Sequence, residues 1–189
     1  MKIGLYFGSF NPIHVGHLII ANHIVAFTSL QQVWFVLSPQ NPLKKSSSLL
    51  NEYHRLHLIK SAIDGENKLQ ASTVEFQLPK PSYTVDTLTY LKEKFPQHEF
   101  SLIMGSDSFS NITNWKNYEV ILKNYPLFIY KRQGFEIENS LGADLIILDA
   151  PLLEISSTHI RKLVKSGKSI RYLVPDIVKE EIERNAYYR

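Results

Sequence analysis

Short apolar segments rich in β-forming residues alternate along this chain with longer amphipathic segments. This alternation is typical of βαβ units, in which helices connect the strands of a parallel sheet. The segments predicted as strands are residues 2–7, 33–37, 69–72, 100–104, 127–130 and 145–148. The sequence therefore predicts an α/β fold built on a doubly wound parallel sheet.

Most segments between these strands are predicted to be helices, because apolar residues recur there at helical spacing between caps or breakers. The predicted helices are residues 14–27, 52–63, 84–94, 118–123, 157–165 and 175–184. The chain has 189 residues, 44% of them hydrophobic, which is enough to bury one sizeable core. No repeat or linker divides it, so we expect a single domain over residues 1–189, ending in a helical region over residues 155–189.

The composition excludes several classes of function. The chain has no cysteine, which excludes disulfides, thiolate metal sites and cysteine nucleophiles and fits a reducing compartment. Its net charge of +3 is too slight to indicate a nucleic acid polymer as partner. The apolar runs at residues 3–7 and 18–27 are interrupted too early for a signal peptide or a membrane span. We expect a soluble cytoplasmic protein with no membrane partner, and small anions as candidate ligands.

A glycine-containing segment, residues 8–17 (GSFNPIHVGH), joins the first predicted strand to the first predicted helix. In a doubly wound sheet, glycine at this place lets backbone N–H groups approach an anion, and the helix amino end adds about half a positive charge. The segment matches neither G-x-G-x-x-G nor G-x-x-x-x-G-K-[ST], so the dinucleotide fingerprint and the P-loop are both absent. It predicts a phosphate site of another kind.

His14 and His17 lie three residues apart in this segment, so on a helix they share a face and can both reach one bound anion. A pair at this spacing is more often a surface or core pair than a ligand-binding pair. A zinc site is a poor interpretation, because helical zinc pairs are commonly four residues apart around a glutamate and no acidic residue or cysteine lies close in the sequence. We predict no protein-bound metal here.

A second segment, residues 155–161 (ISSTHIR), also leads into a predicted helix. Ser156 or Ser157 could be only an N-cap, and Arg161 only a solvated charge. Alternatively, hydroxyls and N–H groups at a helix start, with an arginine one turn later, form a polydentate clamp for an oxyanion. Two such clamps in one chain would suit a triphosphate.

Together these segments resemble the nucleotidyltransferase superfamily whose signature joins [HT]-x-G-H, here residues 14–17, to I-S-S-T-x-x-R, here residues 155–161. Within that superfamily, the chain is similar to the bacterial nicotinate-nucleotide adenylyltransferases along nearly its whole length. Further landmarks follow in order: Pro39-Gln40-Asn41-Pro42, Pro81-Ser82-Tyr83-Thr84, Thr87-Leu88, Gly105-Ser106-Asp107-Ser108, Trp115 and a closing Tyr-Arg. The resemblance implies a Rossmann-like fold and transfer of the adenylyl group of ATP to nicotinic acid mononucleotide, releasing pyrophosphate, in NAD biosynthesis.

The resemblance also implies a role for each matching position. Catalytic contacts to the phosphates are implied for His14, His17, Ser157 and Arg161. ATP binding is implied for Gly8, Ser9, Phe10, Gly16, Gly105, Asp107, Ser156 and Thr158. Binding of the nicotinate nucleotide is implied for Asn41, Lys44, Tyr83, Thr84 and Trp115.

Within the acceptor site, the nicotinic ring would stack on Trp115 and the Thr84 backbone N–H would receive its carboxylate. The sequence departs from the commonest family pattern at two places. Ser9 and Asn11 stand where threonine and aspartate are usual, and Leu43-Lys44-Lys45 stands where a proline and a histidine are frequent, which weakens the phosphate contact assigned to Lys44. Residues 39–48 are also polar enough to be a mobile loop, and Arg55 on the following helix is expected to lie on a solvated face.

The implied chemistry needs no covalent intermediate. The acceptor phosphate, with a second pKa of about 6, is already largely a dianion at neutral pH, so the difficulty is the meeting of two polyanions. A helix terminus contributes only about 0.3–2 kcal/mol per interaction, so side chains and a metal must help. We predict Mg²⁺ held mainly by the ATP phosphates, and a His17 driven toward its charged form.

Two other functions are compatible with the residues. The acceptor could be nicotinamide mononucleotide, FMN or phosphopantetheine in place of nicotinic acid mononucleotide, although Pro81–Thr84 and Trp115 favour a flat pyridine. The protein could instead be a non-catalytic nucleotide-binding sensor that kept the fold. The sequence does not determine whether the chain forms a homo-oligomer.

Overall fold

The computed structural model describes residues 1–40, 49–139, 141–151 and 154–189. Its centre is a six-stranded sheet in the order β3-β2-β1-β4-β5-β6, and every neighbouring pair of strands is parallel. The strands are β1 Lys2–Gly8, β2 Gln32–Leu37, β3 Leu69–Ser72, β4 Glu99–Gly105, β5 Leu127–Tyr130 and β6 Leu145–Leu148. This confirms the predicted doubly wound α/β fold.

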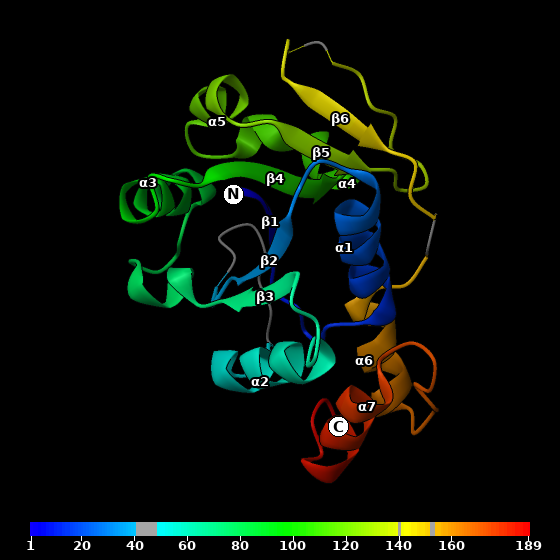
Figure 1. Ribbon diagram of the computed structural model, residues 1–189. Helices are drawn as coiled ribbons and strands as arrows, with labels where there is room; N and C mark the ends of the chain where they lie inside the picture. The colour runs from blue at the N-terminus through cyan, green and yellow to red at the C-terminus, as the bar shows by residue number, and fades with distance from the viewer. Residues whose placement is uncertain (41–48, 140, 152–153) are drawn as a thin grey trace.

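Helices cover both faces of the sheet (Figure 1). The longer ones are α1 Val15–Phe27, α2 Glu52–Ala62, α3 Thr84–Lys94, α5 Tyr118–Asn124, α6 Ser157–Lys165 and α7 Asp176–Arg184. Three short helical turns, which the sequence did not predict, are η1 Val74–Gln77, α4 Ser106–Phe109 and η2 Ile112–Asn114. None of the helices among the described residues is long and apolar enough to span a membrane.

Side chains of each strand alternate between two hydrophobic clusters, one on each face of the sheet. On β2, for example, Phe35 belongs to the cluster formed with α1, α2, α6 and α7, whereas Val36 belongs to the cluster formed with α3 and α5. The inner strands are apolar nearly throughout, because a sheet that is covered on both faces buries the side chains of both faces. We call these the α1 cluster and the α3 cluster.

The direction of the chain reverses between β1 and β4. From β1 the chain proceeds outward to β2 and β3, and it then returns to β4 and proceeds the other way to β5 and β6. Ligands of such sheets bind beyond the carboxyl ends of the strands at this switch point. The loops that follow β1 and β4 therefore define where a site is expected.

Candidate active site

The loop between β1 and α1 turns sharply at Phe10, whose φ is 41°. The Phe10 ring packs back over Gly8, where an added Cβ would lie 2.9 Å from the ring, so this position requires glycine. Phe10 is buried, with its ring edge-on to those of Tyr6 and Phe35. The Phe10 side chain thus belongs to the core, and any contact with a nucleotide falls to its backbone.

His14 and His17 stand at the start of α1 with their rings stacked, the centroids 3.6 Å apart. The His14 backbone N–H donates a hydrogen bond to Nδ1 of His17 at 3.3 Å. Because Nδ1 accepts, the proton of the neutral His17 ring lies on Nε2. Gly16 makes room for the stack, since an added Cβ would lie 3.1 Å from the His14 ring.

His14 is 3% exposed. Burial, together with the nearby charge of Arg132, lowers the pKa of His14 to about 3. Its ring is therefore neutral at neutral pH. Without a bound phosphate, His14 is therefore a neutral hydrogen-bonding group, and the positive charge beside it is that of Arg132.

The two segments predicted to bind phosphate meet in the structure, although they are far apart in the sequence. The Ser157 hydroxyl donates to the Pro12 carbonyl at 2.9 Å, and Arg161 Nη1 donates to the Asn11 carbonyl at 2.8 Å. Ser156 is the N-cap of α6, because its hydroxyl accepts from the His159 N–H at 3.2 Å. The start of α6 is thereby fixed beside the loop that precedes α1 (Figure 1).

Arg132 lies next to the histidine pair, and sequence reasoning did not identify it. Its Nη2 is 3.3 Å from the Tyr130 hydroxyl, and its Nε is 3.6 Å from Asp107 Oδ1. Together with His14 and His17 it lines a small cavity between β5 and α1. Its position two residues after a predicted strand was the available signal, because side chains just beyond strand carboxyl ends face the site.

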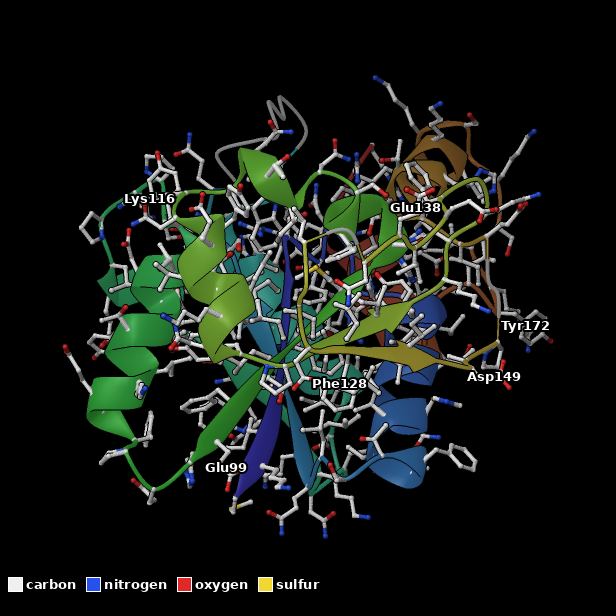
Figure 2. The ribbon with its side chains drawn as sticks, turned by 90° about the horizontal axis from the view of Figure 1, so that it is seen from above. Glu99, Lys116, Phe128, Glu138, Asp149 and Tyr172 are labelled. Atoms are coloured by element: carbon white, nitrogen blue, oxygen red, sulfur yellow. The ribbon has the colours of Figure 1, made fainter. Side chains whose placement is uncertain are left out.

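A larger cavity of about 670 Å³ runs along the carboxyl ends of β1 and β4. It brings together residues predicted for ATP with residues predicted for the acceptor: Gly8, Ser9, Gly105, Asp107, Tyr83, Thr84 and Trp115. Lys116, also in its wall, lies at the opposite end of the sheet from Glu99, the first residue of β4 (Figure 2). The cavity is thus on the side of the sheet that the switch-point rule predicts.

Trp115 and the start of α3 form one end of this cavity. Trp115 is half-buried and packs against the α3 cluster. The N–H groups of Asp86 and Thr87 both donate to the Tyr83 carbonyl, and Tyr83 supplies no side-chain cap. The N–H groups of Thr84 and Val85 precede the first intrahelical hydrogen bond, so this helix end can receive an anion.

The expectation that Arg55 lies on a solvated face was wrong. Arg55 is 0% exposed, and its guanidinium donates to the carbonyls of Leu50, Ser9, Ser38 and Pro39. These carbonyls belong to the loops after β1 and β2 and to the residues before α2. Arg55 therefore ties together the backbone that forms one side of the site.

Two residues predicted to bind the acceptor, Asn41 and Lys44, lie outside the described residues. Apart from the buried Phe10, the remaining predicted positions line the two cavities or lie at the start of α6. The arrangement can hold a polyanion between two helix amino ends and a flat ring near Trp115.

Comparison with known proteins shows the family to which the chain belongs. The cytidylyltransferase-like family model matches residues 5–163. The chain is 52% identical to a protein of Flavobacterium johnsoniae over the full length of both chains. It is 55% identical to a protein of Cytophaga hutchinsonii, covering all of this chain and 98% of the relative. Both relatives are named probable nicotinate-nucleotide adenylyltransferase.

Among solved structures, the fold matches the Plasmodium falciparum nicotinic acid mononucleotide adenylyltransferase complexed with NaAD, at a TM-score of 0.85 and 23% identity over 99% of this chain and 97% of that one. The fold, the paired helix ends and the family match define a nucleotidyltransferase, and the chain belongs to the cytidylyltransferase-like family. Within it, the chain belongs to the nicotinate-nucleotide adenylyltransferases.

Proposed function

We propose that this enzyme transfers the adenylyl group of ATP to nicotinic acid mononucleotide, giving nicotinic acid adenine dinucleotide and pyrophosphate in NAD biosynthesis. The observation that carries the proposal is the meeting of the amino ends of α1 and α6 beside a cavity that ends at Trp115 and the start of α3. The names of the relatives support the same reaction. In this proposal residues 1–189 act as one cytoplasmic nucleotidyltransferase domain whose partners are the two nucleotides.

The ATP phosphates would lie between the loop after β1 and the start of α6. Ser157 and Arg161 now donate to backbone carbonyls of that loop, and we propose that they turn to the β- and γ-phosphates when ATP binds. Ser156 and Thr158 would add contacts at the same helix end, while Gly8, Ser9 and Gly16 allow the backbone to approach. Gly105 and Asp107 would meet the nucleotide sugar, because both line the larger cavity at the end of β4.

In the reaction, an oxygen of the acceptor phosphate forms a bond to the α-phosphorus of ATP while the bond from that phosphorus to the β-phosphate oxygen breaks. No general base is required, because the attacking phosphate is already ionised. The leaving pyrophosphate gains charge, and fixed donors aimed at it lower the barrier. Nε2–H of His17 is one such donor, since its Nδ1 is engaged by the His14 N–H.

The acceptor would occupy the end of the larger cavity. Its nicotinic ring would stack on Trp115 near Tyr83, and its carboxylate would accept from the N–H groups at the start of α3. A carboxylate gains more than an amide at a helix amino end, because it carries a full negative charge. The proposed phosphate contacts of Asn41 and Lys44 rest on the resemblance alone.

Magnesium is part of the proposal as the cation of the ATP complex. No group of three His, Cys, Asp or Glu that could hold a metal was found within residues 1–40, 49–139, 141–151 and 154–189. In the proposal, the magnesium ion keeps water and the nucleotide phosphates as its main ligands. When bound, Mg²⁺ would neutralise part of the phosphate charge.

The test is pyrophosphate release from ATP and Mg²⁺ with nicotinic acid mononucleotide, nicotinamide mononucleotide and phosphopantetheine offered separately. Release chiefly with the nicotinate nucleotide is the expected result. Release chiefly with another acceptor would keep adenylyl transfer and discard the acceptor site at Trp115 and Thr84. No release with any of them would favour a nucleotide-binding sensor.

A further inference from the structure

Glu75 is a buried carboxylate at the wall of the larger cavity that the reaction above does not use. It lies on η1 and is 2% exposed. Its two oxygens accept from hydroxyls on either side of the start of α3: Ser82 Oγ at 2.7 Å from Oε2 and Thr87 Oγ1 at 2.9 Å from Oε1. Burying a carboxylate costs free energy unless hydrogen-bond donors compensate for the lost water.

The partners of Glu75 bracket the helix end that would receive the acceptor's carboxylate. Ser82 precedes the N-cap Tyr83, and Thr87 lies in the first turn of α3. The Thr87 hydroxyl also lies 3.2 Å from the Tyr83 carbonyl, but it has a single hydrogen, which goes to the nearer and charged acceptor. The Glu75 carboxylate therefore fixes the residues on both sides of Tyr83 and Thr84, because Ser82 and Thr87 both donate to it.

Burial raises the pKa of Glu75, whereas hydrogen bonds from Ser82, Ser38 and Thr87 oppose the rise. These partners are hydroxyl groups, and hydroxyl donors suit the ionised form. Ser38 follows β2, so the same carboxylate also links the start of α3 to the sheet edge.

We infer that Glu75 is a positioning residue that fixes the amino end of α3 and thereby sets the preference for a carboxylate over an amide on the acceptor's ring. The inference rests on the proposed function. Glu75 acts through Ser82 and Thr87, whose hydrogen bonds hold the N–H groups of Thr84 and Val85 in place. A competing effect has the opposite sign, because the negative charge of Glu75 would repel an incoming carboxylate.

The variants Glu75→Gln and Glu75→Ala separate the two effects. If positioning dominates, Glu75→Ala raises KM for nicotinic acid mononucleotide by about tenfold, the loss expected when charged hydrogen bonds are removed. Glu75→Gln, which keeps one acceptor oxygen, gives a smaller rise. KM for ATP stays within about twofold in both, and the ratio of kcat/KM for the acid to that for the amide falls. If repulsion dominates, both variants bind the acid more tightly and the ratio rises, a result that would overturn the inference.

Matched variants make the result independent of folding. Glu93→Gln makes the same chemical change at an exposed position of α3 and should leave every constant unaltered. Thr87→Val removes one hydroxyl from the arrangement with Glu75 intact, and it should lower the acid-to-amide ratio in the same direction. An unchanged ratio in Glu75→Gln and Thr87→Val, or an equal rise in KM for both substrates, would overturn the inference. A wild-type protein that does not use the nicotinate nucleotide would instead overturn the proposed function.

Discussion

At the scale of single residues, His17 shows how a backbone contact prepares a side chain for catalysis. The hydrogen bond from the His14 N–H to Nδ1 of His17 fixes the ring orientation and assigns the proton to Nε2. Protonation of Nδ1 would remove this acceptor. The charged His17 expected from the sequence would therefore have to lose the contact, whereas a neutral Nε2–H donor keeps it.

We expect His17→Ala to lower kcat by about a hundredfold with little change in KM for ATP, because a donor to developing charge is lost. The measurement is steady-state pyrophosphate release. His23→Ala, on the same helix with its ring against Phe27, is the control and should keep wild-type rates. An unaltered kcat in His17→Ala would remove this residue from the transition state.

His14 predicts a pH dependence of stability. Its folded pKa of about 3 lies below the unfolded value of 6.5, so the unfolded chain binds a proton that the folded chain excludes. The contribution of the neutral His14 ring to the free energy of unfolding is fully present above pH 6.5 and is lost as the pH falls toward 3. Between pH 7 and pH 5 this loss amounts to about 2 kcal/mol.

We expect His14→Gln to lose about 2 kcal/mol less free energy of unfolding than the wild type over that pH interval, measured by urea unfolding at both pH values. The comparison isolates His14, because the other titrating groups are common to both proteins. Parallel losses in the two proteins would show that His14 takes up a proton in the folded state.

Some site residues could be predicted from the sequence and others could not. His14, His17, Ser157 and Arg161 could be proposed for the site because each motif is contiguous and adjoins a helix start, and their roles stay predictions. Arg55, Glu75 and Arg132 were missed as site residues because their meaning depends on distant partners. Arg55, for instance, donates to the Ser9 carbonyl, which is 46 positions away in the sequence, and no local sequence pattern predicts such a contact.

At the scale of elements, Arg55 joins α2 to the loops after β1 and β2. We expect Arg55→Met to destabilise the protein by at least about 3 kcal/mol, because buried carbonyls lose their donor and each unpaired group costs about 1–3 kcal/mol. Arg184→Met, at a side chain that is 68% exposed, is the control and should change stability by less than about 0.5 kcal/mol. Chemical denaturation measures both, and equal stabilities would contradict the anchoring role.

The strands and longer helices were predicted to within a residue or so, and the bounds Leu69–Ser72, Leu127–Tyr130 and Thr84–Lys94 agree fully. Their signals are local, since apolar runs or helical spacing end at polar or breaking residues. The turns η1, α4 and η2 span three or four residues, which is too short for a helical period to show. Two of these turns carry Glu75 and Asp107, so the missed elements are part of the site.

At the scale of the whole molecule, the sheet separates two cores that support different halves of the site. The α1 cluster contains Ile160 of α6 and Ile182 of α7 and lies behind the proposed phosphate clamps. The α3 cluster contains Ile121 of α5 and packs behind Trp115 and the start of α3. Loosening one core should therefore disturb mainly the substrate held on its side.

We expect Ile182→Ala and Ile121→Ala each to cost about 2–5 kcal/mol of stability, because both side chains are at most 1% exposed and leave a cavity. Their kinetic effects should differ. Ile182→Ala should raise KM for ATP more than KM for the nicotinate nucleotide, because Ile182 belongs to the same cluster as Ile160 of α6, the helix that carries Arg161. Ile121→Ala should do the reverse, because Ile121 belongs to the cluster against which Trp115 packs. Each variant is the matched control of the other, because the substitution and the burial are the same. If both variants raised the two KM values equally, the prediction would be contradicted. Such a result would mean that a change in one core also alters the half of the site on the other face of the sheet.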